Sequence, residues 1–407
     1  MLFGRDKMKN IKTTLKLATL ASAVSIAFAG QAATLDDIAK AVKESETKVN
    51  LRYRIESVDQ DGKDEKATAS TLRSRLTWKS APISNVTVNV EVDNVTAIGI
   101  EDYNSTNNGE IQYPVVADPE GTDLNQANIA YKGKDLTFVA GRQRIVHNNQ
   151  RFIGGVAWRQ NEQTYDAARF IYKASDAMSF DYSYVFNVNR IFGPNDGAQV
   201  ADWHGQFHLA NATFKANKDH KVNAFAYILD NDVAAATSSS TFGVDYSGNF
   251  GLVTANLSYA GQSDSGNNPK NYSADYYKAE LVGKLDKVKL SAGIEVLGSD
   301  KGVGFSTPLA TLHKFQGFAD KFLGTPGNGI EDVYVSAVTK IKGVKLVATY
   351  HDFTSNEGDI DYGSEIDLVA AYKFNKHASG LLKFAKYSAD DHGTDTTKLW
   401  AMATFSF

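Results

Sequence analysis

The chain has 407 residues, no cysteine, a formal net charge of −4 and a mean hydropathy of −0.32. These values exclude a disulfide scaffold, a cysteine-ligated metal site and a helical membrane bundle, and they argue against a nucleic-acid binder. They do not exclude a membrane β-barrel, because the apolar and polar residues of its strands alternate and average out.

The N-terminal segment has the pattern of a secretory signal peptide. Basic side chains at Arg5, Lys7 and Lys9 precede an uncharged stretch over 17–29 that ends in small residues. Such a stretch is too short to cross a bilayer as a helix. We predict that residues 1–32 are a cleaved signal peptide, which leaves 38 basic and 46 acidic side chains, a net charge of −8.

Residues 33–47 form a short segment that we expect to lie in the periplasm. A helix is predicted over 34–47, capped by Thr34 and with Asp36 and Asp37 in its first turn. Leu35, Ile38, Ala39 and Val42 share its apolar face. The segment either plugs the mouth of the following domain or leads into its first strand.

From residue 48 the apolar period changes from 3.6 to 2, which predicts strands with one apolar and one polar face. Val86, Val88 and Val90, for example, alternate with Thr87 and Asn89. The pattern predicts about eighteen strands, near 48–58, 69–79, 85–97, 123–132, 135–145, 164–173, 178–190, 203–215, 221–230, 239–247, 251–260, 274–283, 287–298, 330–340, 343–353, 362–373, 378–388 and 397–407.

The connections alternate between short and long. The long ones include 98–122, 146–163, 261–273 and 299–329, whereas most others are tight turns. All seven prolines fall in proposed connections, as expected of a closed sheet without free edges. This alternation is typical of outer-membrane barrels, which have short periplasmic turns and long extracellular loops.

The last strand ends in an aromatic residue. Leu399, Ala401, Ala403, Phe405 and Phe407 share one face. A final amphipathic strand that ends in phenylalanine resembles the signal read by the barrel-assembly machinery. We therefore predict an all-β, antiparallel up-and-down transmembrane barrel over 48–407, without a cofactor, in the outer membrane of a Gram-negative bacterium and in contact with its lipid and lipopolysaccharide.

The arginines are unevenly distributed. Ten remain after the signal segment, all between 52 and 190. Because an arginine facing lipid at mid-bilayer costs roughly 2–4 kcal/mol, we expect them to face the lumen as a basic strip that favours anions. The alternative is neutralisation by acidic residues as ion pairs between facing walls. The predicted pore-lining residues are Arg52, Arg54, Arg73, Arg75, Arg142, Arg144, Arg159, Arg169, Glu56, Glu91 and Asp93.

Several stretches resemble the alginate-export family of outer-membrane proteins and its porin relatives. The resemblance rests on 137–145 (TFVAGRQRI), 151–160 (RFIGGVAWRQ), 163–170 (QTYDAARF), 51–56 and 70–76. It implies an eighteen-stranded monomeric barrel. In the alginate-exporting members it also implies an arginine-lined pore for a polyuronate. The arginines here match in the first half of the chain only.

The predicted function is passive diffusion of small hydrophilic, preferably anionic, solutes through a pore narrowed by an infolded loop, with 98–122, 146–163 and 299–329 as candidates. A channel selective for alginate or oligouronates and a plugged surface or adhesin barrel remain alternatives. No hydrolase or metalloprotease motif supports an enzyme. His204 and His208 lie ~13 Å apart on a strand, too far to share a metal.

Overall fold

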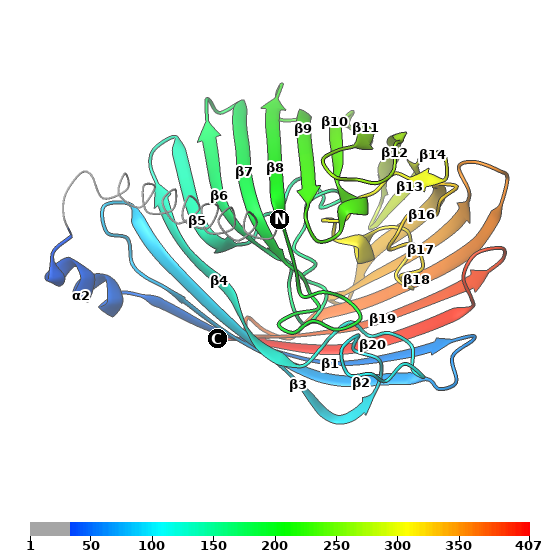
Figure 1. Cartoon of the computed structure of the whole chain (residues 1–407), viewed down its shortest axis with the longest axis horizontal. Helices are drawn as coiled ribbons and strands as arrows, with labels where there is room; N and C mark the ends of the chain where they lie inside the picture. Colours follow the sequence, from blue (N-terminus) through cyan, green and yellow to red (C-terminus); the bar gives the residue numbers. More distant parts are fainter. Residues whose placement is uncertain (1–32) are drawn as a thin grey trace, which may run out of the picture.

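The computed structural model describes residues 33–407, so the predicted signal peptide lies outside the described residues. Eighteen strands form one antiparallel sheet in which every strand pairs with its neighbours in the chain. The sheet closes because β1 (Glu46–Gln60) pairs with both β2 (Ala67–Lys79) and β20 (Thr396–Ser406). Figure 1 shows β1 and β20 side by side although they begin and end the barrel.

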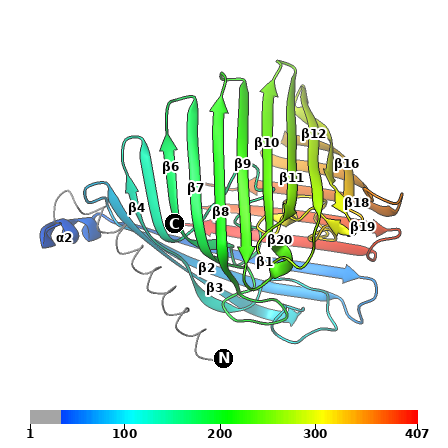
Figure 2. The same cartoon turned by 45° about the horizontal axis from the view of Figure 1, so that its top comes forward.

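The remaining strands follow in chain order (Figure 2). They are β3 (Val86–Asp102), β4 (Gly121–Lys132), β5 (Leu136–Gln143), β6 (Thr164–Lys173), β7 (Met178–Asn189), β8 (Asp202–Lys215), β9 (His220–Asn231), β10 (Ser239–Asn249), β11 (Val253–Asp264), β12 (Ser273–Leu285), β13 (Val288–Leu297), β16 (Ile330–Ile341), β17 (Val344–Thr354), β18 (Asp361–Lys373) and β19 (Ala378–Ala389).

All eighteen predicted strands are confirmed, most with ends within two or three residues. The largest difference is in β3, which extends to Asp102, five residues beyond its predicted end. The predicted connection 299–329 also contains a small hairpin, β14 (Ser299–Asp300) with β15 (Val303–Gly304). Two single 3-10 turns are also present: η1 (Ala235–Thr237) lies between β9 and β10, and η2 (Leu312–Lys314) lies in the long connection before β16.

Each strand presents two chemically different faces. On β18, Glu365 and Asp367 are 1% exposed, whereas Ile366 and Leu368 between them are 47% and 44% exposed. In a closed sheet the buried charged face points inward and the exposed apolar face points outward. All seven prolines lie in connections, as predicted, because proline cannot donate a hydrogen bond to the ladder.

The helix α2 (Leu35–Lys43) precedes the barrel. Thr34 and Asp37 form a capping box at its N-terminus. The helix is shorter than the predicted 34–47, because Glu46 is already paired with Lys79 in the β1–β2 ladder. No helix in the described part of the chain is long and apolar enough to cross a membrane.

Candidate functional site

Three long connections fold back into the barrel. They are loop A (103–120, between β3 and β4), loop B (144–163, between β5 and β6) and loop C (298–329, between β13 and β16). The sequence singled out these same segments by their length. All three start from the end of the barrel opposite the short turns.

The loops contact one another inside the barrel. The Gly154 N–H of loop B donates to the Leu309 carbonyl of loop C over 2.8 Å. The Gln160 N–H of loop B donates to a carboxylate oxygen of Asp118 in loop A, also over 2.8 Å. An added Cβ at Gly154 would overlap Thr311 of loop C. The three loops therefore form one connected unit whose close approach requires glycine at this position.

The β1 arginines bind the backbone of loop B. Arg52 donates from Nε to the Gln160 side chain and from Nη1 to the Ala157 carbonyl, each over 2.9 Å. Arg54 donates from Nη1 to the Trp158 carbonyl over 2.7 Å. Both arginines are buried. Loop B thus covers this part of the predicted arginine strip.

A second contact set joins all three loops to the barrel wall through carboxylates. Arg54 pairs with Asp118 of loop A. Arg159 of loop B pairs with Glu56 of β1 over 3.0 Å and with Asp320 of loop C over 3.1 Å. Because these groups are almost fully buried, removing one partner would leave an uncompensated charge.

His313 of loop C lies between an acid and a base. Its Nδ1 lies 2.6 Å from Asp320, and its Nε2 lies 2.6 Å from the ammonium of Lys383 on β19. Trp158 stacks on the imidazole with ring centroids 4.7 Å apart. Burial, together with the nearby Lys383, lowers the pKa of His313 to about 3. These contacts suit a neutral imidazole that donates to the carboxylate and accepts from the ammonium.

A separate cluster combines two arginines and three acids. Arg75 pairs with Glu162 over 2.7 Å and donates from Nε to Asp93 over 2.6 Å. Arg144 binds Glu162 over 2.6 Å and also contacts Glu91. Burial alone would raise the pKa of the loop carboxyl Glu162, but Arg75 and Arg144 hold it at about 2. The cluster fixes the C-terminal end of loop B to β2 and β3.

Arg142 and Arg169 also pair with carboxylates but are more accessible. Arg142 donates to Asp166 over 2.8 Å, and Arg169 donates to Asp181 over 2.9 Å. The Arg142 side chain is 24% exposed, and that of Arg169 is 15% exposed. Six of the eight predicted arginines therefore have a carboxylate partner, but the pairs join neighbouring strands or an infolded loop and the wall rather than facing walls.

Arg52 and Arg73 are the other two. They are direct cross-strand partners in the β1–β2 ladder, and both are buried. Arg73 donates to the side-chain oxygen of Asn50. Within residues 33–407 neither forms a direct ion pair with a carboxylate, although acids such as Asp118 and Asp93 lie nearby.

A nearby part of the wall, three strands from β1, holds loop C with acceptors. The Ala319 N–H donates to Glu365 over 2.7 Å, and the Phe318 N–H donates to Asp367 over 3.1 Å. Both acids lie on β18 and face inward. The predicted site did not include them, although their alternation with Ile366 indicates an inward direction.

A cavity of about 810 Å³ lies among the loops. Among the described residues, Asp320 is its only acidic lining residue. The Arg190 guanidinium lies over the Phe192 ring, 4.5 Å from its centroid, and over the Trp203 ring, 4.2 Å from its centroid. Within residues 33–407 it has no carboxylate partner. The basic lining residues are Lys63, Arg151, Arg159, Arg190, Lys321 and Lys398.

Of these six cations, the predicted site included only Arg159. The inward-facing period of the last strand could have indicated Lys398, which shares a face with the buried Trp400. Lys321 lies in loop C, which has no strand periodicity from which the direction of its side chain could be predicted. Within residues 33–407 no three side chains of the types that bind metals gather into a possible metal site.

The chain was compared with known proteins at three levels. The model of a family described as alginate export matches residues 44–283. A search of curated proteins found no match. Similar solved structures include Pseudomonas aeruginosa OpdO, with a TM-score of 0.70 and 12% identity over 91% of this chain and 99% of that chain. Pseudomonas aeruginosa OccD3 (OpdP) has a TM-score of 0.69 and 15% identity, over 90% and 92% of the two chains. Acinetobacter baumannii OccAB4 has a TM-score of 0.67 and 13% identity, over 89% and 98%.

Proposed function

The chain belongs to the alginate export family of outer-membrane β-barrels of Gram-negative bacteria, and from this premise we propose that it is a passive channel for small hydrophilic solutes with a preference for anions. The extracellular cavity among loops A, B and C would receive the solute. The loop unit would form the narrow part of the path. No energy source is required, because solutes move down their gradient.

The observation that carries this proposal is the charge of the cavity wall. Six cations and one carboxylate line it among the described residues. Arg151, Arg159 and Lys398 are paired with carboxylates, whereas within residues 33–407 Lys63, Arg190 and Lys321 form no ion pair. A concave basic surface with low-dielectric walls raises the local concentration of anions. Arg190 is especially suited to this role, because its guanidinium has aromatic rings beside it and, in the described part of the chain, no competing carboxylate.

The predicted pore-lining arginines would then have two roles. Arg54, Arg75 and Arg159, which pair with buried acids, would hold the loops in place. The more accessible Arg142 and Arg169 would contribute to the field along the solute path. Arginine suits both, because it stays charged and binds carboxylates through two donors.

Reconstitution in a planar bilayer tests the proposal. We expect ion current and, in a salt gradient, a reversal potential of the sign that marks anion selectivity. Arg190→Gln combined with Lys321→Gln should shift it toward cations. Lys270→Gln, which removes an exposed charge from a loop outside the cavity, is the matched control. Absence of current at every voltage would instead favour a plugged surface barrel.

A second candidate is a channel selective for oligouronates. The family match favours it, as does the combination of Arg190 with Phe192 and Trp203, because an arginine binds a carboxylate while aromatic rings pack against a sugar face. Oligouronates should then block the current at lower concentrations than neutral oligosaccharides of equal length. Equal block by both would exclude this selectivity.

Membrane partners follow from the same family premise. We propose that Phe407, which is 65% exposed, is recognised by the barrel-assembly machinery, and that the outer apolar belt contacts lipid and lipopolysaccharide.

We expect the protein to be a monomer, which native mass spectrometry in mild detergent can check. A positive esterase or protease assay on purified protein would instead revive the enzymatic alternative.

A further inference from the structure

The helix α2 lies beyond the edge of the barrel, next to the start of β1, in both overall views (Figures 1 and 2). This is the end with the short turns, which faces the periplasm in an outer-membrane barrel. Only Glu44 and Ser45 separate the helix from β1, so its last turn stays within about 7 Å of the rim. The Ala81 N–H of the turn between β2 and β3 donates to the Ala41 carbonyl over 3.1 Å. The helix therefore flanks the mouth of the barrel and does not plug it.

The helix has one apolar and one charged face. With 3.6 residues per turn, Leu35, Ile38 and Val42 fall within an arc of about 60°. They are 85%, 47% and 54% exposed, whereas Ala41 at the edge of this arc is buried. The opposite face carries the charged side chains Asp36, Asp37, Lys40 and Lys43. The barrel thus covers only the edge of the apolar face.

A helix of this length gains little stability by itself. It has nine residues, whereas isolated helices shorter than about 12–15 residues are marginal in water. The capping box formed by Thr34 and Asp37 satisfies donors at its N-terminus but leaves the apolar face in water. Most helical stability in proteins comes from packing of an amphipathic face. This face therefore requires a surface from outside the described part of the chain.

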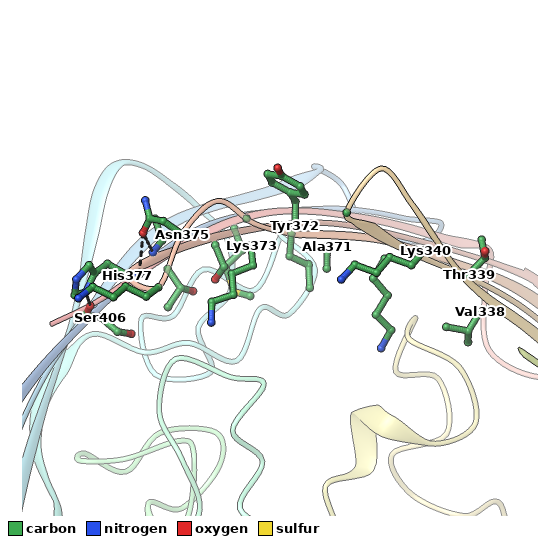
Figure 3. A pocket seen from close by; sticks show the side chains of 18 of the residues that line it. Val338, Thr339, Lys340, Ala371, Tyr372, Lys373, Asn375, His377 and Ser406 are labelled. Carbon is green, nitrogen blue, oxygen red and sulfur yellow. Dashed lines mark hydrogen bonds between the residues drawn. The ribbon is translucent and has the colours of Figure 1, made fainter. Parts of the chain in front are cut away.

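Large apolar side chains are also exposed on the turns and strand ends at this end of the barrel, at Phe250, Leu252, Leu285, Ile341 and Phe374. Phe374 packs against Tyr372 with ring centroids 5.0 Å apart. In Figure 3, Tyr372 points to one side of the sheet, whereas Lys340 and Lys373 point to the other. Lys373 shares its strand face with the inward-facing Asp367, so the two aromatic rings lie on the lipid side. Aromatic girdles flank the apolar band of outer-membrane barrels, which places this rim at the membrane boundary.

We propose that α2 is an interfacial helix that lies on the periplasmic leaflet of the outer membrane, with Leu35, Ile38 and Val42 inserted among the phospholipid chains. Its short connection to β1 holds it at the level that the exposed aromatic turns mark. A short helix with one apolar and one charged face lies in the plane of such a boundary, with the apolar face buried about 5–10 Å deep. Lys43, beside Val42, can extend its ammonium to headgroup phosphates. This inference rests on the outer-membrane location of the chain and not on conduction.

Spin labelling of the full-length protein in vesicles of phosphatidylethanolamine and phosphatidylglycerol tests the proposal. Because the chain has no cysteine, each single-cysteine variant carries one label. Labels at Leu35→Cys, Ile38→Cys and Val42→Cys should be more accessible to oxygen, which is enriched in lipid, than to a water-soluble nickel chelate. Asp36→Cys and Lys40→Cys, on the charged face of the same helix, are the matched controls and should show the reverse order. The ratio of the two accessibilities should follow the 3.6-residue period of the helix.

The other outcomes of this measurement overturn the proposal. Access of the nickel chelate to labels on both faces would show a helix free in the periplasm. Protection of the apolar-face labels from both reagents would show that protein covers them, either a second copy of the chain or a separate partner. A label at Leu368→Cys, on the exposed outer face of β18, gives the reference value for contact with lipid.

A second pair of variants tests what holds the helix in place. Leu35→Ser with Ile38→Ser should move the label at Val42→Cys into water, because the apolar face is lost. Asp36→Asn with Lys40→Gln should leave that label in lipid. If the label stayed in lipid beside both serines, the apolar face would not anchor the helix and the proposal would be wrong. Heat-modifiable migration in gels shows that each barrel is folded. Absence of channel current would reject the proposed function and leave these accessibilities unchanged.

Discussion

Two nearby parts of the barrel wall hold the infolded loops with opposite chemistry. On β1, Arg52 and Arg54 donate to carbonyl groups of loop B. On β18, Glu365 and Asp367 accept from backbone N–H groups of loop C. These two strands lie only three positions apart around the barrel, so donors on one part of the wall and acceptors on a nearby part hold the loop unit from the same side.

This difference explains why the chain keeps both kinds of buried charge. A loop backbone inside the barrel exposes donors and acceptors that must be satisfied. Guanidinium groups satisfy the carbonyls, and carboxylates satisfy the N–H groups. The net charge of −8 of residues 33–407 therefore says little about the charges that a solute meets inside the barrel.

The largest expected loss of stability comes from Arg159→Ala, which removes the cation that pairs with Glu56 of β1 and Asp320 of loop C. It would leave Glu56 and Asp320 buried with fewer cations nearby, at a cost of roughly 3–5 kcal/mol. Denaturant unfolding should show this loss, and bilayer conductance should rise as the loops loosen. Arg190→Ala is the control, because it deletes a charge in the same cavity without leaving a carboxylate unpaired. Similar losses in both variants would contradict the buried-pair argument.

On the acidic side, Glu365→Ala removes the acceptor of the Ala319 N–H. The expected loss is about 1–3 kcal/mol, the cost of an unsatisfied buried donor. Glu365→Gln keeps an acceptor and relieves repulsion from Asp367, so it should change stability little. Thermal unfolding of the two variants distinguishes them. If Gln destabilises as much as Ala, the charge of Glu365 matters rather than its hydrogen bond.

Acidification should loosen loop C. Burial and Lys383 hold the pKa of His313 at about 3, below its ordinary value of 6.5, although Asp320 opposes the shift. A released loop takes up this proton more readily, so loop packing is most stable above about pH 6.5 and weakens as the pH falls toward 3. Current fluctuations should therefore increase between pH 7 and pH 5.

A variant without this imidazole checks the assignment. His313→Gln should lose the pH dependence in that range. Burial would raise the pKa of Asp320, but His313, Lys398 and Arg159 hold it well below its ordinary range, so this carboxylate contributes only at lower pH. An unchanged pH profile in His313→Gln would assign the effect to another group.

The smallest stability effect is expected for Arg142→Gln. Its pair with Asp166 is partly solvent-accessible, so the loss should stay below about 1 kcal/mol. The reversal potential should nevertheless shift toward cations, whereas Arg142→Lys should restore it. A stability loss as large as that of Arg159→Ala would remove the distinction between accessible and buried pairs.

Much of the barrel follows from the sequence alone. The period of two predicts each strand and the direction of its side chains, because consecutive residues of a strand point to opposite faces. The alternation of short and long connections predicts which end carries the loops, and the prolines fall outside the ladder because they lack a donor. These are local properties, and the eighteen strands of the structure agree with them.

The partners of the inward side chains were decided by the tertiary structure. Arg52 and Gln160 lie 108 residues apart, and His313 and Lys383 lie 70 apart. The sequence indicates that Arg52 faces inward, but barrel closure and the return of loop B determine that it binds a loop carbonyl. Local pattern therefore determined the wall and its polarity. Long-range packing decided which charges are neutralised, because that depends on which distant segments the closed barrel brings within hydrogen-bond distance.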